Sequence, residues 1–303
     1  MSEAYGWTKS MWSADENTEV CPFSSVLGLE GLVGRVDDAK TVALCGVETD
    51  HLPLNMFPIG GFQGVYNLGT KKVASVTSDQ YTIIQHKDVL NATIAALHSF
   101  GHEVQGTLIN RHDRISVMFS FPDIVLNDES DGIEVGGVIN NSYDTTGSFK
   151  GHAHMIRVVC TNGMTMRRIL PETNFSVRHI GEVNDKVIGA LETYYTGLVK
   201  DQSAVSEVID AAMATGLEFV DSRQVEDTLA FQLGKRKHAA NIVDQTWDGE
   251  LETNKWDLYN AVTEYTSHTP MTYQVYDAIG DAAMKMLSPN TTIAPFVEMG
   301  AIS

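Results

Sequence analysis

The sequence lacks long apolar segments and contains few cysteines. None of its apolar runs approaches the ~20 residues of a membrane-spanning helix, so we expect no membrane-spanning segment. Residues 1–9 lack a basic region followed by an apolar one, so we expect no signal peptide. The three cysteines, Cys21, Cys45 and Cys160, are too widely spaced for a zinc motif and odd in number for a disulfide framework. These absences favour a cytoplasmic protein with reduced thiols.

Net positive charge is also lacking, because the 303 residues carry a formal charge of −18. A strongly acidic chain generally repels nucleic acid. The distribution is uneven, however. Residues 145–181 contain five cations and the single acid Glu172, a net of +4, so the remainder carries −22. The five cations, here called the basic island, are Lys150, Arg157, Arg167, Arg168 and Arg178. Such an island indicates a polyanion site or a contact with an acidic protein surface.

The pattern of apolar residues predicts strands first and helices afterwards. Short β-branched or alternating segments predict strands over residues 41–47, 71–77, 81–84, 104–109, 115–121, 134–141 and 156–160. Helical spacing predicts helices over residues 88–100, 184–198, 205–214, 224–233, 255–267 and 272–287. Residues 51–69, rich in proline and glycine, predict a loop. This order favours an α+β fold with an antiparallel sheet and packed helices.

The same pattern divides the chain into three regions. We expect an irregular N-terminal arm over residues 1–40, an α+β core domain over 41–200, and an acidic helical C-terminal region over 201–303.

Most candidate functional side chains fall within residues 140–164, which read as strand, polar turn, strand, and a turn at Asn162-Gly163. His152 and His154 would share one face of a strand and could ligate zinc or iron. Two ligands do not complete a site, so we predict no bound metal. Ser142, Asp144 and His152 include the residue types of a hydrolytic triad, but no Gly-x-Ser-x-Gly elbow is present.

The remaining candidate residues suit the binding of a ligand better than catalysis. Without a phosphate-binding loop of the Gly-Lys-Ser/Thr type, we expect no ATPase activity and no cofactor. Arginine forks suit phosphates, and aromatic rings suit unstacked bases. We therefore predict that the basic island binds single-stranded DNA phosphates and that Tyr143 supports a base. Two alternatives stay open. One is a metal-dependent nuclease or hydrolase that uses His152, His154 and Asp144. The other is a structural or assembly protein whose basic island contacts an acidic neighbour.

Three segments carry a resemblance to a known family. They are Asn141-Ser-Tyr-Asp-Thr-Thr-Gly-Ser-Phe149, Arg157-Val-Val-Cys-Thr-Asn-Gly-Met164 and Arg178-His179. They resemble the phage- and plasmid-borne family catalogued as domain of unknown function nine-three-two. Residues 81–86 and 260–268 are similar to its other signatures, so the resemblance runs from about Val73 to His268. The first motif usually reads Asn-Ser-His-Asp-Gly, and here Tyr143 and Thr145 replace the histidine and the glycine.

A distant similarity of this family to Rad fifty-two-like single-strand annealing proteins implies further properties. It implies a β-β-β-α core, a homo-oligomeric ring or filament, and a DNA-binding groove that works without ATP. The expected function is therefore single-stranded DNA binding and annealing in phage- or plasmid-type recombination.

Overall fold

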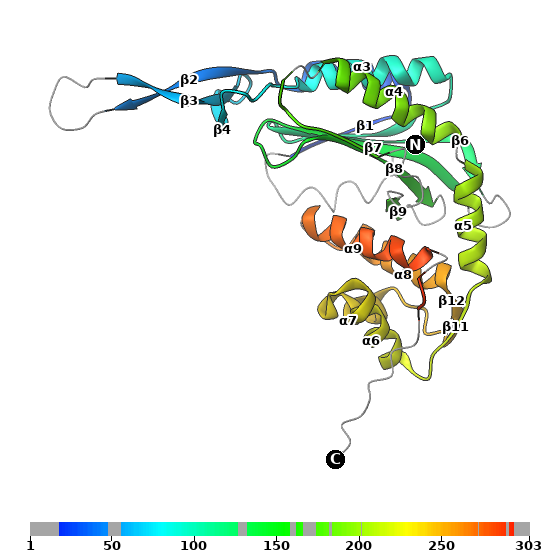
Figure 1. The fold of residues 1–303 in the computed structure, drawn as a ribbon. Helices are drawn as coiled ribbons and strands as arrows, with labels where there is room; N and C mark the ends of the chain where they lie inside the picture. The colour runs from blue at the N-terminus through cyan, green and yellow to red at the C-terminus, as the bar shows by residue number, and fades with distance from the viewer. Residues whose placement is uncertain are drawn as a thin grey trace.

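A computed structural model gives the fold of the chain (Figure 1). It describes residues 18–47, 56–126, 132–157, 162–165, 174–181, 184–200, 202–271, 273–288 and 291–293. The fold is α+β, with antiparallel sheets and a helical C-terminal part, as the sequence predicts. No helix within these residues is both long enough and apolar enough to cross a membrane.

Strands dominate the first part of the chain and helices the second. The strands are β1 (Glu19–Phe23), β2 (Ala39–Val47), β3 (Met56–Asn67), β4 (Lys72–Ser78), β5 (Gln105–Asn110), β6 (Arg114–Leu126), β7 (Ile133–Ser142), β8 (Phe149–Arg157), β9 (Asn162–Thr165), β10 (Phe175–Val177), β11 (Gly216–Glu218) and β12 (Glu252–Asn254). The helices are α2 (Val26–Glu30), the 3-10 turn η1 (Val33–Arg35), α3 (His86–Phe100), α4 (Asn184–Lys200), α5 (Gln202–Ala214), α6 (Ser222–Leu233), α7 (Arg236–Gln245), α8 (Lys255–His268) and α9 (Tyr273–Leu287).

The largest sheet, here called the main sheet, has the order β1-β5-β6-β7-β8-β10, and β9 pairs with β8 beside β10. All its pairings are antiparallel. Val117 and Phe119 of β6 and Val135 and Ile139 of β7, all at odd-numbered positions, are buried and apolar. Because side chains alternate along a strand, these residues line one face, which packs against α3 and α4.

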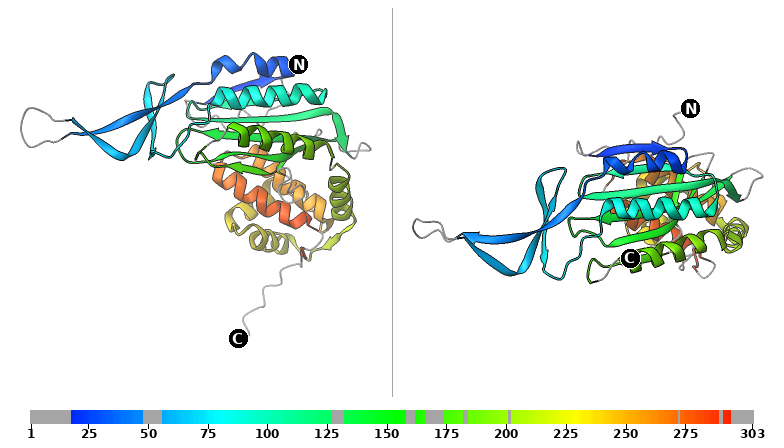
Figure 2. Two further views of the ribbon diagram at one scale, coloured as in Figure 1. Left: turned by 45° about the horizontal axis from the view of Figure 1, so that its top comes forward. Right: turned by 90° about the horizontal axis from the view of Figure 1, so that it is seen from above.

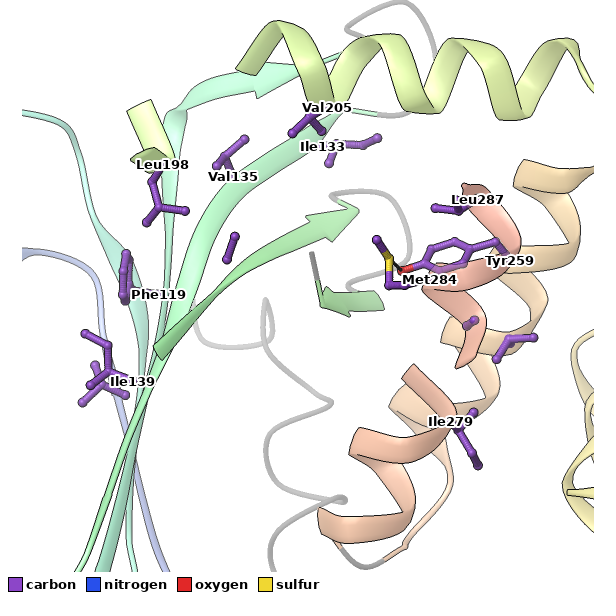
Figure 3. Close-up of a cluster of buried hydrophobic side chains, with 14 of the residues drawn as sticks. Phe119, Ile133, Val135, Ile139, Leu198, Val205, Tyr259, Ile279, Met284 and Leu287 are labelled. Carbon is purple, nitrogen blue, oxygen red and sulfur yellow. Dashed lines mark hydrogen bonds between the residues drawn. The ribbon is translucent and has the colours of Figure 1, made fainter. Parts of the chain in front are cut away.

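The helices lie on both sides of the main sheet (Figures 1 and 2). α3 and α4 cover the apolar face, whereas α8 and α9 lie on the opposite side and contact β9. The hydrophobic core runs from the sheet through Leu198 and Val205 (Figure 3). It continues between α8 and α9, where the Tyr259 hydroxyl lies 3.2 Å from the Met284 sulfur.

Gly101 ends α3 with a left-handed φ of 69°, a conformation that glycine adopts without steric cost.

Strands β2, β3 and β4 form a separate three-stranded sheet, here called the β-arm, which projects from the body (Figures 1 and 2). Much of β3 was expected to be a loop, so that expectation for residues 51–69 is wrong from Met56 to Asn67. Gly64 of β3 does not turn the chain but makes room for a neighbouring side chain. A Cβ at Gly64 would lie 2.9 Å from Val42 Cγ2, so the residue permits close approach of the side chain on the neighbouring strand.

Three other expectations need correction. The segment predicted as an irregular arm contains β1, which pairs with β5 because Cys21 and Phe23 bury their side chains in the core. Residues 81–84 do not form a strand, because only Tyr81 makes a bridge, to Ile180. Asn162 and Gly163 do not form a turn, because both pair with β8 as part of β9. Cys160 lies outside the described residues.

Candidate nucleic-acid interface

The face of the main sheet opposite to α3 and α4 carries a row of polar side chains across four strands. Ser116 of β6 pairs with Asn140 of β7, Asn140 pairs with Lys150 of β8, and Lys150 pairs with Ser176 of β10. Paired residues on neighbouring strands project to the same face, so these four side chains, here called the polar row, lie side by side. Each of them is half-buried or exposed.

The polar row is rich in hydrogen-bond donors. Ser116 Oγ donates to Asn140 Oδ1 at 2.6 Å, which fixes the orientation of the amide. Within the described part of the chain, the Asn140 Nδ2 atom is buried and has no hydrogen-bond partner. Ser148 and Ser176 share a hydrogen bond of 2.6 Å between their hydroxyl groups. On the accessible part of the row, an acceptor-rich ligand would therefore find hydroxyl and ammonium donors.

Cations stand at both ends of the polar row. Arg114 begins β6 two residues before Ser116, its side chain is 45% exposed, and it pairs with Asp144. Arg178 directly follows β10 and is exposed. Arg114, Lys150 and Arg178 therefore place three positive charges along the polar row. The negative charge of Asp144, which pairs with Arg114, partly compensates them. These cations are up to 64 residues apart in the sequence (residues 114 and 178), and the pairing of β6, β7, β8 and β10 brings them to one region of the sheet.

The structure brings together only part of the predicted basic island. Lys150 and Arg178 lie near each other because β10 pairs with β8. Arg157 ends β8 opposite Ile133 and Asn162. Since a strand rises ~3.3 Å per residue, its backbone lies about 23 Å from Lys150. The Arg157 side chain, and all of Arg167 and Arg168, fall outside the residues that the structure describes.

The position of Tyr143 does not fit its predicted role of supporting a base. Tyr143 is fully buried, and its ring stacks on the His86 ring with centroids 3.7 Å apart. Its hydroxyl accepts a hydrogen bond from the His86 amide at 2.7 Å and donates to the Asp37 carbonyl oxygen at 3.0 Å. With one ring face occupied and the whole side chain enclosed, Tyr143 is a structural residue rather than a stacking platform.

Tyr143 belongs to a polar junction that attaches the β-arm to the body. Ser75 of β4 donates to the Tyr143 carbonyl oxygen at 2.7 Å. Asn67 at the end of β3 donates to Asp113 at 2.8 Å, and the Tyr143 amide donates to the Asp113 carbonyl oxygen at 2.7 Å. The junction therefore joins two strands of the arm to the turn between β5 and β6 and to the end of β7.

Two buried histidines lie at this junction and are neutral. His86 accepts a hydrogen bond from the Asn141 side-chain amide at 2.9 Å. Burial lowers the pKa of His86 to about 3, although the backbone of His112 partly opposes this effect. Burial also lowers the pKa of His179, whose ring stacks on Tyr81 with centroids 5.0 Å apart. Burial disfavours the charged form of both imidazoles, so these histidines are poorly suited to extend the interface toward phosphates.

The residues of the hydrolytic alternative are not brought together. Ser142 ends β7 and donates to the Gly147 carbonyl oxygen at 2.7 Å, whereas His152 pairs with Val138, four residues away along β7. Four residues of strand span about 13 Å, too far for a hydrogen bond. The His154 side chain is outside the described residues. Among those that are described, no group of three or more His, Cys, Asp or Glu side chains is placed to hold a metal ion.

Sequence reasoning missed Arg114, Ser116 and Asn140. Polar residues recur at every second position in Arg114-Ile-Ser116, and this alternation predicts one buried and one accessible face of the strand. The signal was present, but the pairing that aligns Ser116 with Asn140 and Lys150 depends on register, which the alternation does not specify.

Comparisons with known proteins identify a family. A family model described as "Domain of unknown function (DUF932)" matches residues 73–286, more than two thirds of the chain. The match begins at Val73, where the resemblance seen in the sequence begins, and extends beyond His268. No curated protein and no solved structure matches the chain. The similarity to single-strand annealing proteins therefore stays a prediction.

Proposed function

The chain belongs to the DUF932 family, and we propose that it binds single-stranded DNA and promotes the annealing of complementary strands without ATP. The setting would be phage- or plasmid-type recombination in the cytoplasm. Annealing needs no bond to be made or broken within the protein. It needs a strand held by its phosphates with the pairing edges of its bases free.

The polar row is the observation that carries this proposal. The Ser176 hydroxyl group and the Lys150 ammonium group of the row are donors that suit phosphate oxygens. Arg114 and Arg178 add guanidinium groups at the two ends, and guanidinium forks bind phosphate bidentately. Because the row crosses four strands at ~4.8 Å each, it spans about 14 Å, room for two or three nucleotides.

The chemistry of the row favours contacts with the DNA backbone over contacts with bases. Serine, asparagine and lysine side chains offer no flat apolar surface on which a base could stack. Binding through phosphates is independent of base sequence, which is the property that an annealing protein requires. We further propose that Arg157, Arg167 and Arg168 bind phosphates beyond the polar row, so that the basic island follows a longer stretch of DNA.

The acidity of the rest of the chain shapes the expected behaviour. A charge of −18 repels DNA at long range, and lowering the salt strengthens this repulsion. The local contacts between cations and phosphates release counterions, and because of this release we expect binding to strengthen as salt is lowered. Several copies acting together would raise the affinity, because linked weak sites bind with avidity.

Fluorescence anisotropy with a labelled oligothymidine tests the proposal. We expect the wild-type chain to bind, and we expect Lys150→Gln and Arg178→Gln each to weaken binding several-fold at low salt. Lys186→Gln is the matched control, because Lys186 is exposed on α4, on the opposite side of the main sheet. Annealing of complementary strands, followed by fluorescence quenching without ATP, should decrease in the same variants.

Two results would contradict the proposal. The first is that wild-type protein shows no salt-dependent binding of single-stranded DNA. The second is that Lys186→Gln weakens binding as much as Lys150→Gln, which would remove the polar row as the site. Cleavage of the DNA that stops on addition of a chelator would favour the metal-dependent nuclease instead.

A further inference from the structure

The β-arm has one apolar face, here called the open face, that the described part of the chain leaves exposed. Phe62 is 56% exposed, Val73 50% and Val76 58%. Phe62 and Tyr66 are four residues apart on β3 and so point to the same side. Val73 pairs with Tyr66, and Val76 pairs with Gly64 between the two rings, so both valines belong to this face. Large apolar side chains grouped on one accessible sheet face indicate a contact surface.

The opposite face of the β-arm is already occupied. Val65 is fully buried and packs with Ala39 and Tyr143. Ser75, which pairs with Val65, donates to the Tyr143 carbonyl oxygen at 2.7 Å. The arm is therefore held against the body by one face, and the open face points away from these contacts.

The charge of the β-arm does not call for a strongly charged partner. Residues 39–78 contain three lysines, Glu48 and Asp50, a net of +1, and the two acids lie outside the described residues. Within strands β2 to β4, the single charged residue on the open face is Lys40, which pairs with Tyr66. The Lys40 Nζ atom lies 5.8 Å from the centre of the Tyr66 ring. The face therefore combines an exposed aromatic ring with valines and one cation.

This combination matches the chemistry of a nucleotide in a single strand. A nucleobase presents a flat, uncharged face that stacks on aromatic side chains, and the phosphate beside it favours a nearby cation. The polar row lacks such a ring, because its side chains are those of serine, asparagine and lysine. Phosphates and bases would thus be bound by two different parts of the molecule.

The open face also lies next to one end of the polar row in the fold. Gln63, which follows Phe62 on β3, donates to the Tyr81 carbonyl oxygen at 2.8 Å. Tyr81 forms a β-bridge with Ile180, whose side chain is 51% exposed. Ile180 follows Arg178, the exposed cation at that end of the row, by two residues. A DNA strand that leaves the row at Arg178 therefore meets the base of the arm first.

We propose that the open face of the β-arm binds the bases of single-stranded DNA, with one base stacked on the Phe62 ring and Lys40 near its phosphate. The inference rests on the proposed function, in which the polar row holds phosphates of the same strand. Stacking uses the face of a base, so the edge that pairs with a complementary strand stays free. In a duplex the faces of the bases are covered by their neighbours, so the arm would favour single strands.

Fluorescence anisotropy with two labelled strands of equal length tests this proposal. One is oligothymidine, and the other is an abasic strand that carries the same phosphates without bases. Wild-type protein should bind oligothymidine about fivefold more tightly or better, because one stacked base contributes at least that factor. Phe62→Leu keeps an apolar side chain but removes the ring, so it should lose this preference and bind the abasic strand like wild type. Phe62→Trp, which restores a ring, should keep the preference.

Two further variants are controls for this measurement. Phe231→Leu is the matched control, because Phe231 is exposed on α6, away from the arm, and both affinities should equal those of wild type (Figure 1). Lys150→Gln should weaken binding of both strands by the same factor, because it removes a phosphate contact that both strands make. Circular dichroism melting checks that each variant folds.

The outcomes distinguish this inference from the proposed function. A wild-type protein that binds both strands equally well, or a Phe62→Leu variant that keeps the preference for oligothymidine, would overturn base stacking and leave the phosphate contacts in place. A wild-type protein that binds neither strand would overturn both proposals. A Phe62→Leu variant with unchanged DNA binding but a lower mass in light scattering would overturn the inference in favour of a protein contact.

Discussion

The hydroxyl of Tyr143 accepts a hydrogen bond from the backbone amide of His86 at 2.7 Å, and the two rings stack with centroids 3.7 Å apart. This contact joins the end of β7 to the first residue of α3. It also meets the β-arm, because Ser75 of β4 donates to the Tyr143 carbonyl oxygen. Tyr143 is fully buried, although the residues next to it in the sequence are polar.

Replacing Tyr143 by phenylalanine should destabilise the fold without changing the exposed surface. The substitution removes the acceptor of the buried His86 amide, and an unsatisfied buried donor costs about 1 to 3 kcal/mol. Urea denaturation followed by circular dichroism measures the loss. Tyr66→Phe, on the half-exposed face of the β-arm, is the control and should change stability much less. Equal losses in the two variants would contradict the role assigned to Tyr143.

Stability should decrease as the pH falls below the ordinary histidine pKa of 6.5. Burial lowers the pKa of folded His86 to about 3, so between these values the unfolded state binds more protons. Stability is fully present above pH 6.5, and its loss from His86 reaches about 2 kcal/mol at pH 5.

The pH dependence of urea denaturation, in wild type and in His86→Gln, checks this expectation. The variant is less stable at neutral pH, but its stability should fall less steeply between about pH 7 and about pH 5. His98→Gln is the control, because His98 is exposed on the same helix, and its pH dependence should match wild type. If wild type and His86→Gln lose stability in parallel, His86 is not the group responsible.

Two glycine substitutions should have opposite effects. A Cβ at Gly136 would lie 1.9 Å from the Phe119 carbonyl oxygen, so Gly136→Ala forces β6 and β7 apart. We expect a loss of about 3 kcal/mol or more, at the upper end of core overpacking. Gly189 lies in α4 with nothing within 4 Å of such a Cβ, so Gly189→Ala should stabilise by up to about 1 kcal/mol. Thermal unfolding measures both, and a stable Gly136→Ala variant would contradict the packing described for β6 and β7.

Much of the fold was accessible from the sequence because its elements are strongly periodic. The helices α3 and α8 and the hairpin of β5 and β6 follow directly from apolar spacing and from Gly101. Strands β2 and β4 of the β-arm were predicted, but β3 between them was missed because Pro58, Gly60 and Gly61 resemble a loop. Gly60 and Gly61 lie where the pairing of β3 with β2 is irregular, and Gly64 permits close side-chain packing, tertiary requirements that override the local signal.

The candidate interface was only partly accessible for a related reason. The sequence identified Lys150 and Arg178, but their proximity depends on the pairing of β8 with β10 across more than twenty residues. Tyr143 was misassigned because its polar neighbours suggested exposure, whereas its hydroxyl has buried partners from distant segments. Strand register and long-range hydrogen bonds decide both cases, and neither is encoded in local periodicity.

The salt dependence of single-stranded DNA binding tests the central proposal most directly. For single strands, each phosphate that a protein neutralises adds about 0.7 to the magnitude of the slope of log Kobs against log salt. Lys150→Gln/Arg178→Gln should therefore reduce the magnitude of the wild-type slope by about 1.4, whereas Lys186→Gln should leave it unchanged. A double variant whose slope equals that of wild type would show that the polar row does not bind the phosphates and would contradict the account.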